Sequence, residues 1–286
     1  QETIISSAQE NNAAEIVCGG STTNSLAAAA NYGSVCGHIC QLGDDAMGQV
    51  YEKDLKDNGI ISLNQFRHNN FKTGRCLVLI TPNSERTMGT YLGASEQLKF
   101  DPTFIDHVNN AKIIFSEGYQ LTSSENFEAF VSILESTNLE VKFAFSLSDP
   151  FVIENFRDRV EKILELKRID YLFCNLEEAK SLVGDNFEDS LKQISNNFVV
   201  TNGSKPSTLF SNGQFKQLSP YKVKAIDSNG AGDIFAGSTL HKIIEGESFF
   251  HACEFGNYAS SIIVQEKSPR LSKVKYTEIV TNFKRD

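Results

Sequence analysis

The chain has 286 residues, of which 40% are hydrophobic and 22% are charged, and its formal net charge is −9. This length suits one large α/β domain with a substantial core. No run of about eighteen apolar residues occurs, so the sequence predicts no membrane-spanning helix. The acidic balance argues against general binding of nucleic acids or anionic membranes, although it leaves a single nucleotide possible. We therefore expect a cytoplasmic globular protein without those two partners.

The cysteines and histidines give no sign of a metal centre. The six cysteines are scattered and lack zinc spacing, and the five histidines form no His-x-x-x-His pair. The start of the chain, Gln1-Glu2-Thr3-Ile4, has neither the basic nor the apolar segment of a signal peptide. These features favour reduced, buried thiols in a cytoplasmic protein.

Short apolar runs alternate with amphipathic stretches along the chain. The predicted helices cover 21–32, 45–58, 123–136, 151–166, 231–244 and 249–264. The predicted strands cover 35–42, 111–116, 140–146, 169–174 and 197–201. This alternation predicts an α/β fold whose parallel sheet is covered by helices on both faces. An Asn-Gly turn between 207–211 and 214–218 predicts a hairpin as well.

The segment 71–92 interrupts this alternation. The apolar run 76–80 is followed by the polar turn Thr81-Pro82-Asn83-Ser84 and then by a second extended stretch, 85–92. A strand, a turn and a strand in this order predict a second hairpin.

A glycine-rich turn near the C-terminus carries the strongest chemical signal. Gly230 and Gly232 lack the Cβ atoms that would keep an anion away from the backbone, and the predicted helix that begins here would aim its free N–H groups at the same point. Asp233 follows directly. It could cap the helix, or it could take a proton from an attacking hydroxyl, and the residues alone leave both open.

The stretch Asp227-Ser228-Asn229-Gly230-Ala231-Gly232-Asp233 resembles the signature of the ribokinase-like family, the sugar and nucleoside kinases also called PfkB kinases. The common form there is Asp-Thr-x-Gly-Ala-Gly-Asp, so Ser228 is a mild departure. The resemblance implies that the amides of Gly230, Ala231 and Gly232 form an anion hole for the transferring phosphoryl group. It also implies that Asp233 is the base that activates the substrate hydroxyl.

An upstream match concerns the acceptor. Gly19, Gly20 and Asn24 are similar to the Gly-Gly-x-x-x-Asn segment of this family, which contacts sugar or ribose hydroxyls. The two glycines let the backbone approach a small polar ligand, and the amide of Asn24 can both donate and accept. A plain helix start with Ser21 as N-cap is the compatible alternative.

A second acceptor-side match lies in the turn Gly43-Asp44-Asp45-Ala46-Met47-Gly48, which resembles a Gly-x-Asp-x-x-Gly turn. The resemblance implies that Asp45 touches substrate hydroxyls. A capped helix start is again the alternative.

Two further matches concern the nucleotide. Asn175 and Glu178 resemble an Asn-x-x-Glu element that organises Mg²⁺ and the phosphates through water, although this spacing is also that of a capping box. Thr201 and Gly203 resemble the nucleotide-side Thr-x-Gly turn, where Pro206 departs from the usual further glycine. The resemblance implies two more contacts near the nucleotide and metal, at Asp227 and Asn257.

The family resemblance also assigns the segment 71–93 to a small β lid over the substrate, with 1–70 and 94–286 forming the α/β core. A lid excludes water that would compete with the acceptor hydroxyl. Arg86 could bring positive charge to the substrate, or it could be a solvated hairpin residue. The implied assembly is a monomer, or a homodimer formed through the lid.

One departure concerns the beginning of the chain. Family members usually begin with a strand that carries a substrate-binding Asp, well before the Gly-Gly segment. Here only about eighteen residues precede Gly19, and their pattern is helical and polar. We therefore expect this strand and its Asp to be missing.

Together these features predict a ribokinase-like three-layer α/β/α sandwich with a mostly parallel sheet and a β lid. The implied activity is transfer of the γ-phosphoryl group of ATP, with Mg²⁺, to a sugar or nucleoside hydroxyl, with a lean towards a nucleoside or ribose-like acceptor. One alternative is a non-catalytic relative that binds nucleotide or sugar. The intact Asp233 argues against it, whereas the missing first strand and Pro206 argue for it. A nicotinamide oxidoreductase is a weaker alternative, because Gly-x-Gly-x-x-Gly is absent after an early strand.

Overall fold

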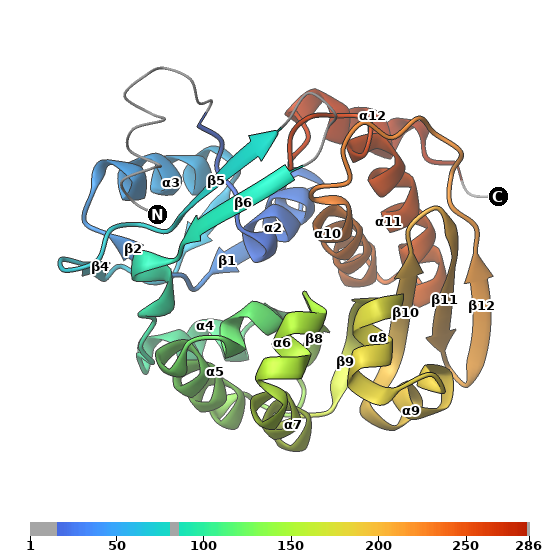
Figure 1. Cartoon of the computed structure of the whole chain (residues 1–286), viewed down its shortest axis with the longest axis horizontal. Coiled ribbons are helices and arrows are strands. Elements are labelled where there is room, and N and C mark those ends of the chain that lie inside the picture. The colour runs from blue at the N-terminus through green and yellow to red at the C-terminus, as the bar shows by residue number, and fades with distance from the viewer. Residues whose placement is uncertain (1–15, 81–85, 285–286) are drawn as a thin grey trace.

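A computed structural model describes residues 16–80 and 86–284 of the chain (Figure 1). Its main sheet has six strands in the order β12-β11-β10-β9-β8-β7. The neighbours among β7 to β10 run parallel, whereas β11 and β12 are added antiparallel through hairpins. The six strands are β7 (Ile113–Glu117), β8 (Lys142–Ser146), β9 (Ile169–Asn175), β10 (Ser195–Asn202), β11 (Lys205–Ser211) and β12 (Gln214–Leu218). The predicted mostly parallel sheet and the 207–218 hairpin are confirmed.

The central strands are apolar on both faces because both faces are buried. In β8, Phe143 and Phe145 pack into one core while Ala144, between them, packs into the other. In β10, Val200 belongs to the first core and Val199 to the second. Continuous apolar runs of this kind are typical of parallel strands between two helical layers.

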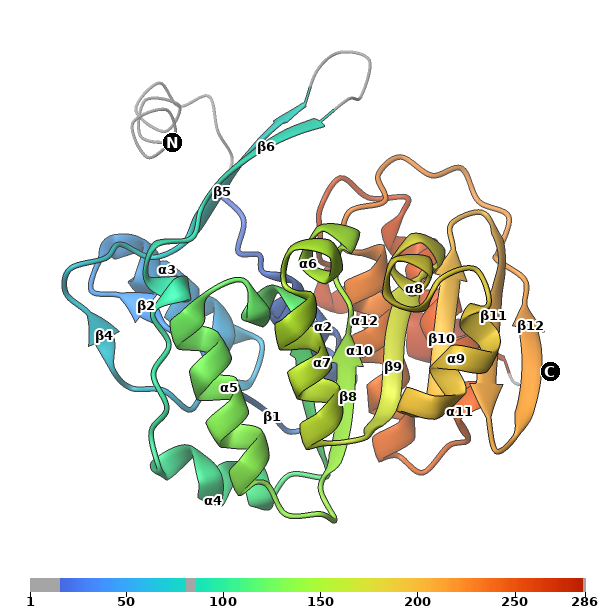
Figure 2. The same cartoon turned by 60° about the horizontal axis from the view of Figure 1, so that its bottom comes forward.

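Helices cover both faces of the sheet, and Figure 2 shows the two layers. The first layer consists of α5 (Ser124–Ser136), α6 (Pro150–Asn155), α7 (Arg157–Leu166), α8 (Leu176–Val183) and α9 (Phe187–Ile194). The second consists of α10 (Ala231–Ile244) and α11 (Phe249–Ile263), on which α2 (Ser21–Asn31) and α12 (Lys273–Asn282) pack. This arrangement confirms the three-layer prediction.

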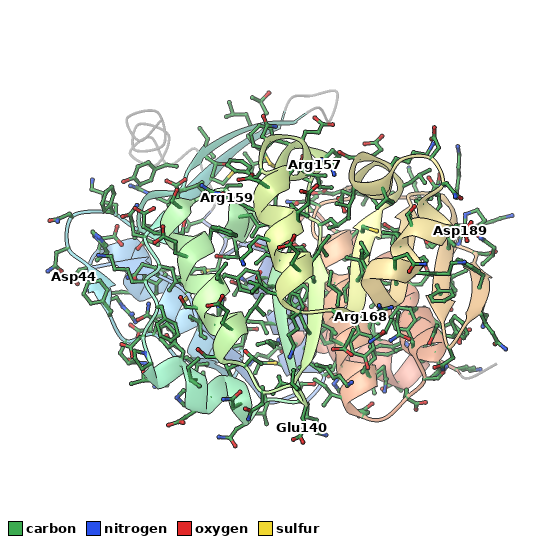
Figure 3. All side chains as sticks on the ribbon, turned by 90° about the horizontal axis from the view of Figure 1, so that it is seen from below. Asp44, Glu140, Arg157, Arg159, Arg168 and Asp189 are labelled. Carbon is green, nitrogen blue, oxygen red and sulfur yellow. The ribbon has the colours of Figure 1, made fainter. Side chains whose placement is uncertain are left out.

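Two arginines on α7 also connect the first layer. Figure 3, which shows the molecule from below, labels both of them, Arg157 and Arg159. The guanidinium of Arg159 donates to the carbonyl of Leu121, and that of Arg157 donates to the carbonyl of Leu182. The predicted helix 151–166 is divided at Phe156 into α6 and α7.

A smaller part of the chain lies beside the main sheet. The predicted strand 35–42 is divided into β1 (Cys36–His38) and β2 (Leu42–Gly43), which pair with β3 (Ile60–Ser62) and β4 (Arg67–His68) respectively. Helix α3 (Ala46–Asp57) lies between β2 and β3 in the chain. The remaining elements are α4 (Thr103–Asn109) and two 3₁₀ turns, η1 (Gly93–Glu96) and η2 (Gly118–Leu121).

The predicted second hairpin is present as β5 (Arg75–Ile80) and β6 (Arg86–Tyr91), and its turn lies outside the described residues. In the described part of the chain these two strands pair only with each other. The hairpin extends away from the body of the molecule (Figure 2).

The structure describes only the end of the segment that precedes Gly19. Residues 1–15, on which most of the helical expectation for this segment falls, lie outside the described residues, and 16–20 form no helix. Among the described residues β7 pairs with β8 alone, so one edge of β7 has no strand partner. Within the same ranges no helix is both long and apolar enough to cross a membrane.

Candidate active site

The carboxyl ends of the parallel strands bring the candidate residues to one edge of the sheet. The strand registers align Glu117 with Ser146, and Asn175 with Thr201. Strand β12 runs in the same direction as β9 and β10, because two antiparallel pairings separate it from β10. The segment 219–230 therefore leaves β12 at this edge and leads into α10. Open α/β sheets bind their ligands at this edge.

The glycine-rich turn begins α10. Gly230 is the N-cap with a left-handed φ of 76°, and a Cβ there would lie 2.4 Å from the carbonyl oxygen of Pro269. A Cβ at Gly232 would instead meet open space. This turn therefore requires glycine for its shape at one position and leaves room for a ligand at the other.

The amides of this turn are only partly engaged. Of the three amides predicted for the anion hole, that of Ala231 donates to the carbonyl of Ser228 at 3.2 Å, whereas within the described residues those of Gly230 and Gly232, and that of Asp233, have no acceptor. The carboxylate of Asp227 accepts a hydrogen bond from the backbone N–H of Asn229 at 2.7 Å and so stabilises the loop before α10. The free donors of a helix N-terminus form an anion site, so the amides of Gly230, Gly232 and Asp233 are available to bind one.

Asp233 joins this turn to the N-terminal helix α2. Its Oδ1 accepts from the Ser21 hydroxyl at 2.7 Å, and its Oδ2 accepts from the Asn24 amide at 2.8 Å. The Ser25 hydroxyl donates to the backbone carbonyl of Asp233 at 2.9 Å. The structure thus brings the glycine-rich turn together with the upstream Gly-Gly-x-x-x-Asn segment.

Burial raises the pKa of Asp233, while the hydrogen bonds from Asn24 and Ser21 and the charge of Arg270 act in the opposite direction. A higher pKa gives the carboxylate more affinity for a proton than an exposed Asp has. General bases work best when their pKa approaches the working pH. The environment therefore suits Asp233 to proton abstraction.

The N-terminus of α2 differs from the capped start that the sequence favoured. The N-cap is Gly20, with φ 96° and no side-chain cap, and not Ser21. Ser21 is the first helical residue, which frees its hydroxyl to donate to Asp233. A Cβ at Gly19 would meet nothing within 4 Å, so this side of the turn is open.

Glu117 is a site residue that the sequence reasoning missed. It ends β7, is buried, and its Oε2 has no hydrogen-bond partner among the described residues. Burial and, to a smaller extent, the charge of Asp233 raise the pKa of Glu117 to about 7, against interactions with Ser21 and Thr22 that lower it. The available signal is an acidic residue two positions after the apolar run 113–115.

Asp45 caps α3 and anchors the base of the hairpin. Its carboxylate accepts from the Gly48 amide at 2.8 Å, and from the Thr73 hydroxyl and amide at 2.7 and 3.0 Å. Burial alone would raise the pKa of Asp45, but these hydrogen bonds outweigh it and lower the pKa. The capped-helix alternative is therefore correct, and a contact between Asp45 and the acceptor stays a prediction.

Asn175 and Glu178 form the capping box of α8. The backbone N–H of Glu178 donates to Asn175 Oδ1 at 2.8 Å, and the backbone N–H of Asn175 donates to Glu178 Oε2 at 3.0 Å. Burial raises the pKa of Glu178 to about 7, opposed by the hydrogen bond from Asn175. This geometry confirms the capping-box alternative, and it is compatible with a further role for the carboxylate.

The oxygen donors here fit a magnesium ion that is held indirectly. In the part of the chain that the structure describes, no three acidic, histidine or cysteine side chains converge. Mg²⁺ usually keeps several waters and binds through one or two carboxylates together with substrate phosphates. Glu178 could therefore hold it only through water or alongside phosphate.

The remaining nucleotide-side residues lie on separate elements. The Thr201 hydroxyl donates to the Cys174 carbonyl at 3.3 Å, and Gly203 has a positive φ in the turn after β10. The Asn257 amide donates to the carbonyl of Ser219 at 2.9 Å, which ties α11 to the loop after β12. Arg86 is the first residue of β6. The structure does not describe its side chain, so its contact with the substrate stays a prediction.

Comparison with known proteins gives consistent results. Residues 5–275 match the model of the pfkB family carbohydrate kinases. The chain is 28% identical to adenosine kinase 2 of Arabidopsis thaliana over 88% of this chain and 79% of that protein. It is 29% identical to adenosine kinase of Dictyostelium discoideum over 82% and 73%. The crystal structure of adenosine kinase from Sinorhizobium meliloti superimposes with a TM-score of 0.84, at 24% identity, over 96% and 88% of the two chains.

Proposed function

Because this chain belongs to the pfkB family of carbohydrate kinases, we propose that it phosphorylates a nucleoside, with Asp233 as base and the α10 N-terminus as anion hole. The chain is an ATP-dependent phosphotransferase that acts on a hydroxyl group of a nucleoside or sugar. The observation that carries the finer proposal is the position of Asp233. Asp233 carries one of the amides at the N-terminus of α10 that have no acceptor among the described residues, and its carboxylate is hydrogen-bonded to α2 beside the open Gly19 turn.

In this mechanism the acceptor hydroxyl loses its proton to the Asp233 carboxylate. Its oxygen forms a bond to the γ-phosphorus as the bond from that phosphorus to the ADP oxygen breaks. Charge on the equatorial oxygens of the transferring group is stabilised by the amides of Gly232 and Asp233. Catalysis of this reaction depends mainly on positioning and electrostatic stabilisation, and these groups supply both.

The acceptor would lie against Gly19, Gly20 and Asn24, under the β5–β6 lid. We assign 71–93 to this lid and the rest of the chain to the core. Asn24 lies on the first turn of α2, directly beside Asp233. The proposal of a nucleoside, with adenosine as the first candidate, follows from the relatives named adenosine kinases.

The nucleotide would lie over the ends of β9 and β10, near Thr201, Gly203, Asp227 and Asn257. Asn175 and Glu178 would hold Mg²⁺ through water. The ion would supply charge neutralisation between the phosphates.

The experiment is turnover of ATP by the unchanged chain and by Asp233→Asn, with a panel of nucleosides and sugars. Asp233→Asn should retain its fold and nucleotide binding while kcat falls by about 10²- to 10⁴-fold, the scale of a lost general base. Asp189→Asn is the matched control, because Asp189 holds the same third position in α9 but is exposed. Near-normal turnover by Asp233→Asn would contradict the assignment, and activity with sugars alone would contradict the nucleoside.

A further inference from the structure

Arg270 lies in the loop between α11 and α12, and its side chain contacts residues at the start of α2. Only 9% of its side chain is exposed. Its Nε donates to Asn24 Oδ1 at 2.7 Å, and its Nη2 donates to the Gly19 carbonyl at 3.2 Å. Its Nη1 pairs with the carboxylate of Asp54 on α3. One guanidinium therefore holds two of the residues assigned to the acceptor.

The hydrogen bonds form a chain from Asp54 through Arg270 and Asn24 to Asp233. A guanidinium can only donate, and an ionised carboxylate can only accept. The Asn24 amide between them has one orientation that satisfies both, with its oxygen towards Arg270 and its nitrogen towards Asp233. The reverse orientation would place the amide oxygen against the carboxylate and the amide N–H groups against the guanidinium.

We propose that Arg270 is a positioning residue for phosphoryl transfer, which fixes the Asn24 amide so that its N–H points at the Asp233 carboxylate. Arg270 does not touch the reacting atoms. It acts by holding the orientation of Asn24, and with it the orientation of the base. The inference rests on the proposed role of Asp233.

The charge of Arg270 has a second effect on the same carboxylate. Among the described residues, the ionisable groups that interact with Asp233 are Glu117, on β7, and Arg270, whose charge lowers the pKa of Asp233 against the effect of burial. In the same ranges, the other titratable groups that interact with Arg270 are Cys18, His38, Tyr51, Asp54 and Tyr276. Removal of this positive charge should therefore raise the pKa of Asp233, which a titration measures.

The experiment compares Arg270→Gln with Arg270→Lys and with Arg67→Gln. Arg67 pairs with Glu52 on the same helix α3, and its side chain is 20% exposed, so Arg67→Gln removes a similar ion pair away from Asp233. Two quantities are measured for each variant. One is the ¹³C NMR titration of the Asp233 carboxyl carbon, assigned by its loss in Asp233→Asn. The other is the pH profile of kcat and KM.

Arg270→Gln should raise the pKa of Asp233 by about 1 unit and move the acidic limb of kcat to higher pH by the same amount. At neutral pH kcat should fall about tenfold or more while KM for ATP stays close to its original value. Arg270→Lys should restore much of the pKa, and less of kcat, because an ammonium lacks the fixed fork of the guanidinium. Arg67→Gln should change neither quantity.

An unchanged Asp233 titration in Arg270→Gln and Arg270→Lys would overturn the proposal. So would equal losses of kcat in Arg270→Gln and Arg67→Gln, since that would indicate a merely structural role. The NMR titration needs no turnover. A shifted pKa in a chain whose Asp233→Asn variant keeps its activity would therefore count against the base assignment and not against the link from Arg270 to Asp233.

Discussion

The protonation of Glu117 determines how much negative charge lies beside Asp233. The pKa of Glu117 is raised from 4.5 to about 7, mainly by burial. The folded state therefore binds more protons than the unfolded state between these two pH values. The stability contributed by this residue is present below pH 4.5 and is lost as the pH rises through 7.

Glu117→Gln should therefore stabilise the protein relative to the unchanged chain at pH 8, by up to about 3 kcal/mol, and should have much less effect at pH 4.5. The isosteric amide removes the titration while it keeps the shape of the side chain. Thermal unfolding at the two pH values measures the difference. The exposed Glu154→Gln is the control, and the same stability gain in both variants at pH 8 would contradict the prediction.

Helix α10 carries two glycines with opposite surroundings. A Cβ at Gly237 would lie 2.1 Å from the carbonyl oxygen of Ser25, because α2 crosses α10 at this point. A Cβ at Gly232, five residues earlier, meets open space. The first glycine permits two helices to approach, and the second leaves the anion site clear.

The same substitution at the two positions should therefore have different effects. Gly237→Ala should push α2 away and destabilise the protein by about 1 to 3 kcal/mol or more, as overpacking does. Gly232→Ala should leave the melting temperature unchanged or raise it, because alanine favours helix, while kcat falls. Melting temperatures and kcat for the pair test this, and equal melting temperatures would show that the helix crossing tolerates a methyl group.

At the scale of elements, the sequence predicted the helices and strands that have a clear hydrophobic pattern. The apolar strands β8 to β10 and the helices α2, α10 and α11 lie close to their predicted positions. Helices α8 and α9 were not predicted. The residues that begin α8 also match a ligand-binding element, and Leu191 is the buried side chain of the short helix α9. Strands β3 and β4 were missed because they are only three and two residues long.

The site was predictable only where residues form a local pattern. The glycine-rich turn and Asn24 could be identified by their spacing, and the structure places Asn24 beside Asp233. Glu117 and Arg270 belong to no such pattern. Glu117 reaches the site through the register of β7, and Arg270 reaches it through a loop that returns to α2, so both depend on tertiary structure.

At the scale of the whole molecule, the β5–β6 hairpin stands apart from the other strands. Among the described residues its strands pair only with each other, and Val78, Leu79 and Met88 are largely exposed. Segments with few buried contacts open easily, so backbone amides there should exchange quickly without ligand.

Binding of the acceptor should slow amide exchange across 75–80 and 86–91, if the hairpin closes over it. Hydrogen–deuterium exchange with mass spectrometry measures this with and without the nucleoside. Strand β8, which is buried on both faces, serves as the internal reference and should not change. Exchange in the hairpin that is already as slow as in β8, or that ligand leaves unaltered, would identify a fixed hairpin instead of a lid.

The bond between Asn24 and Arg270 joins residues 246 positions apart. During synthesis the N-terminal part of a chain emerges and begins to fold first. Helix α2 must therefore wait for almost all of the chain before its polar face meets α10 and Arg270. A nascent or prematurely terminated product that lacks this loop would leave Asn24 without Arg270, so we expect such a product to be less active than the full chain.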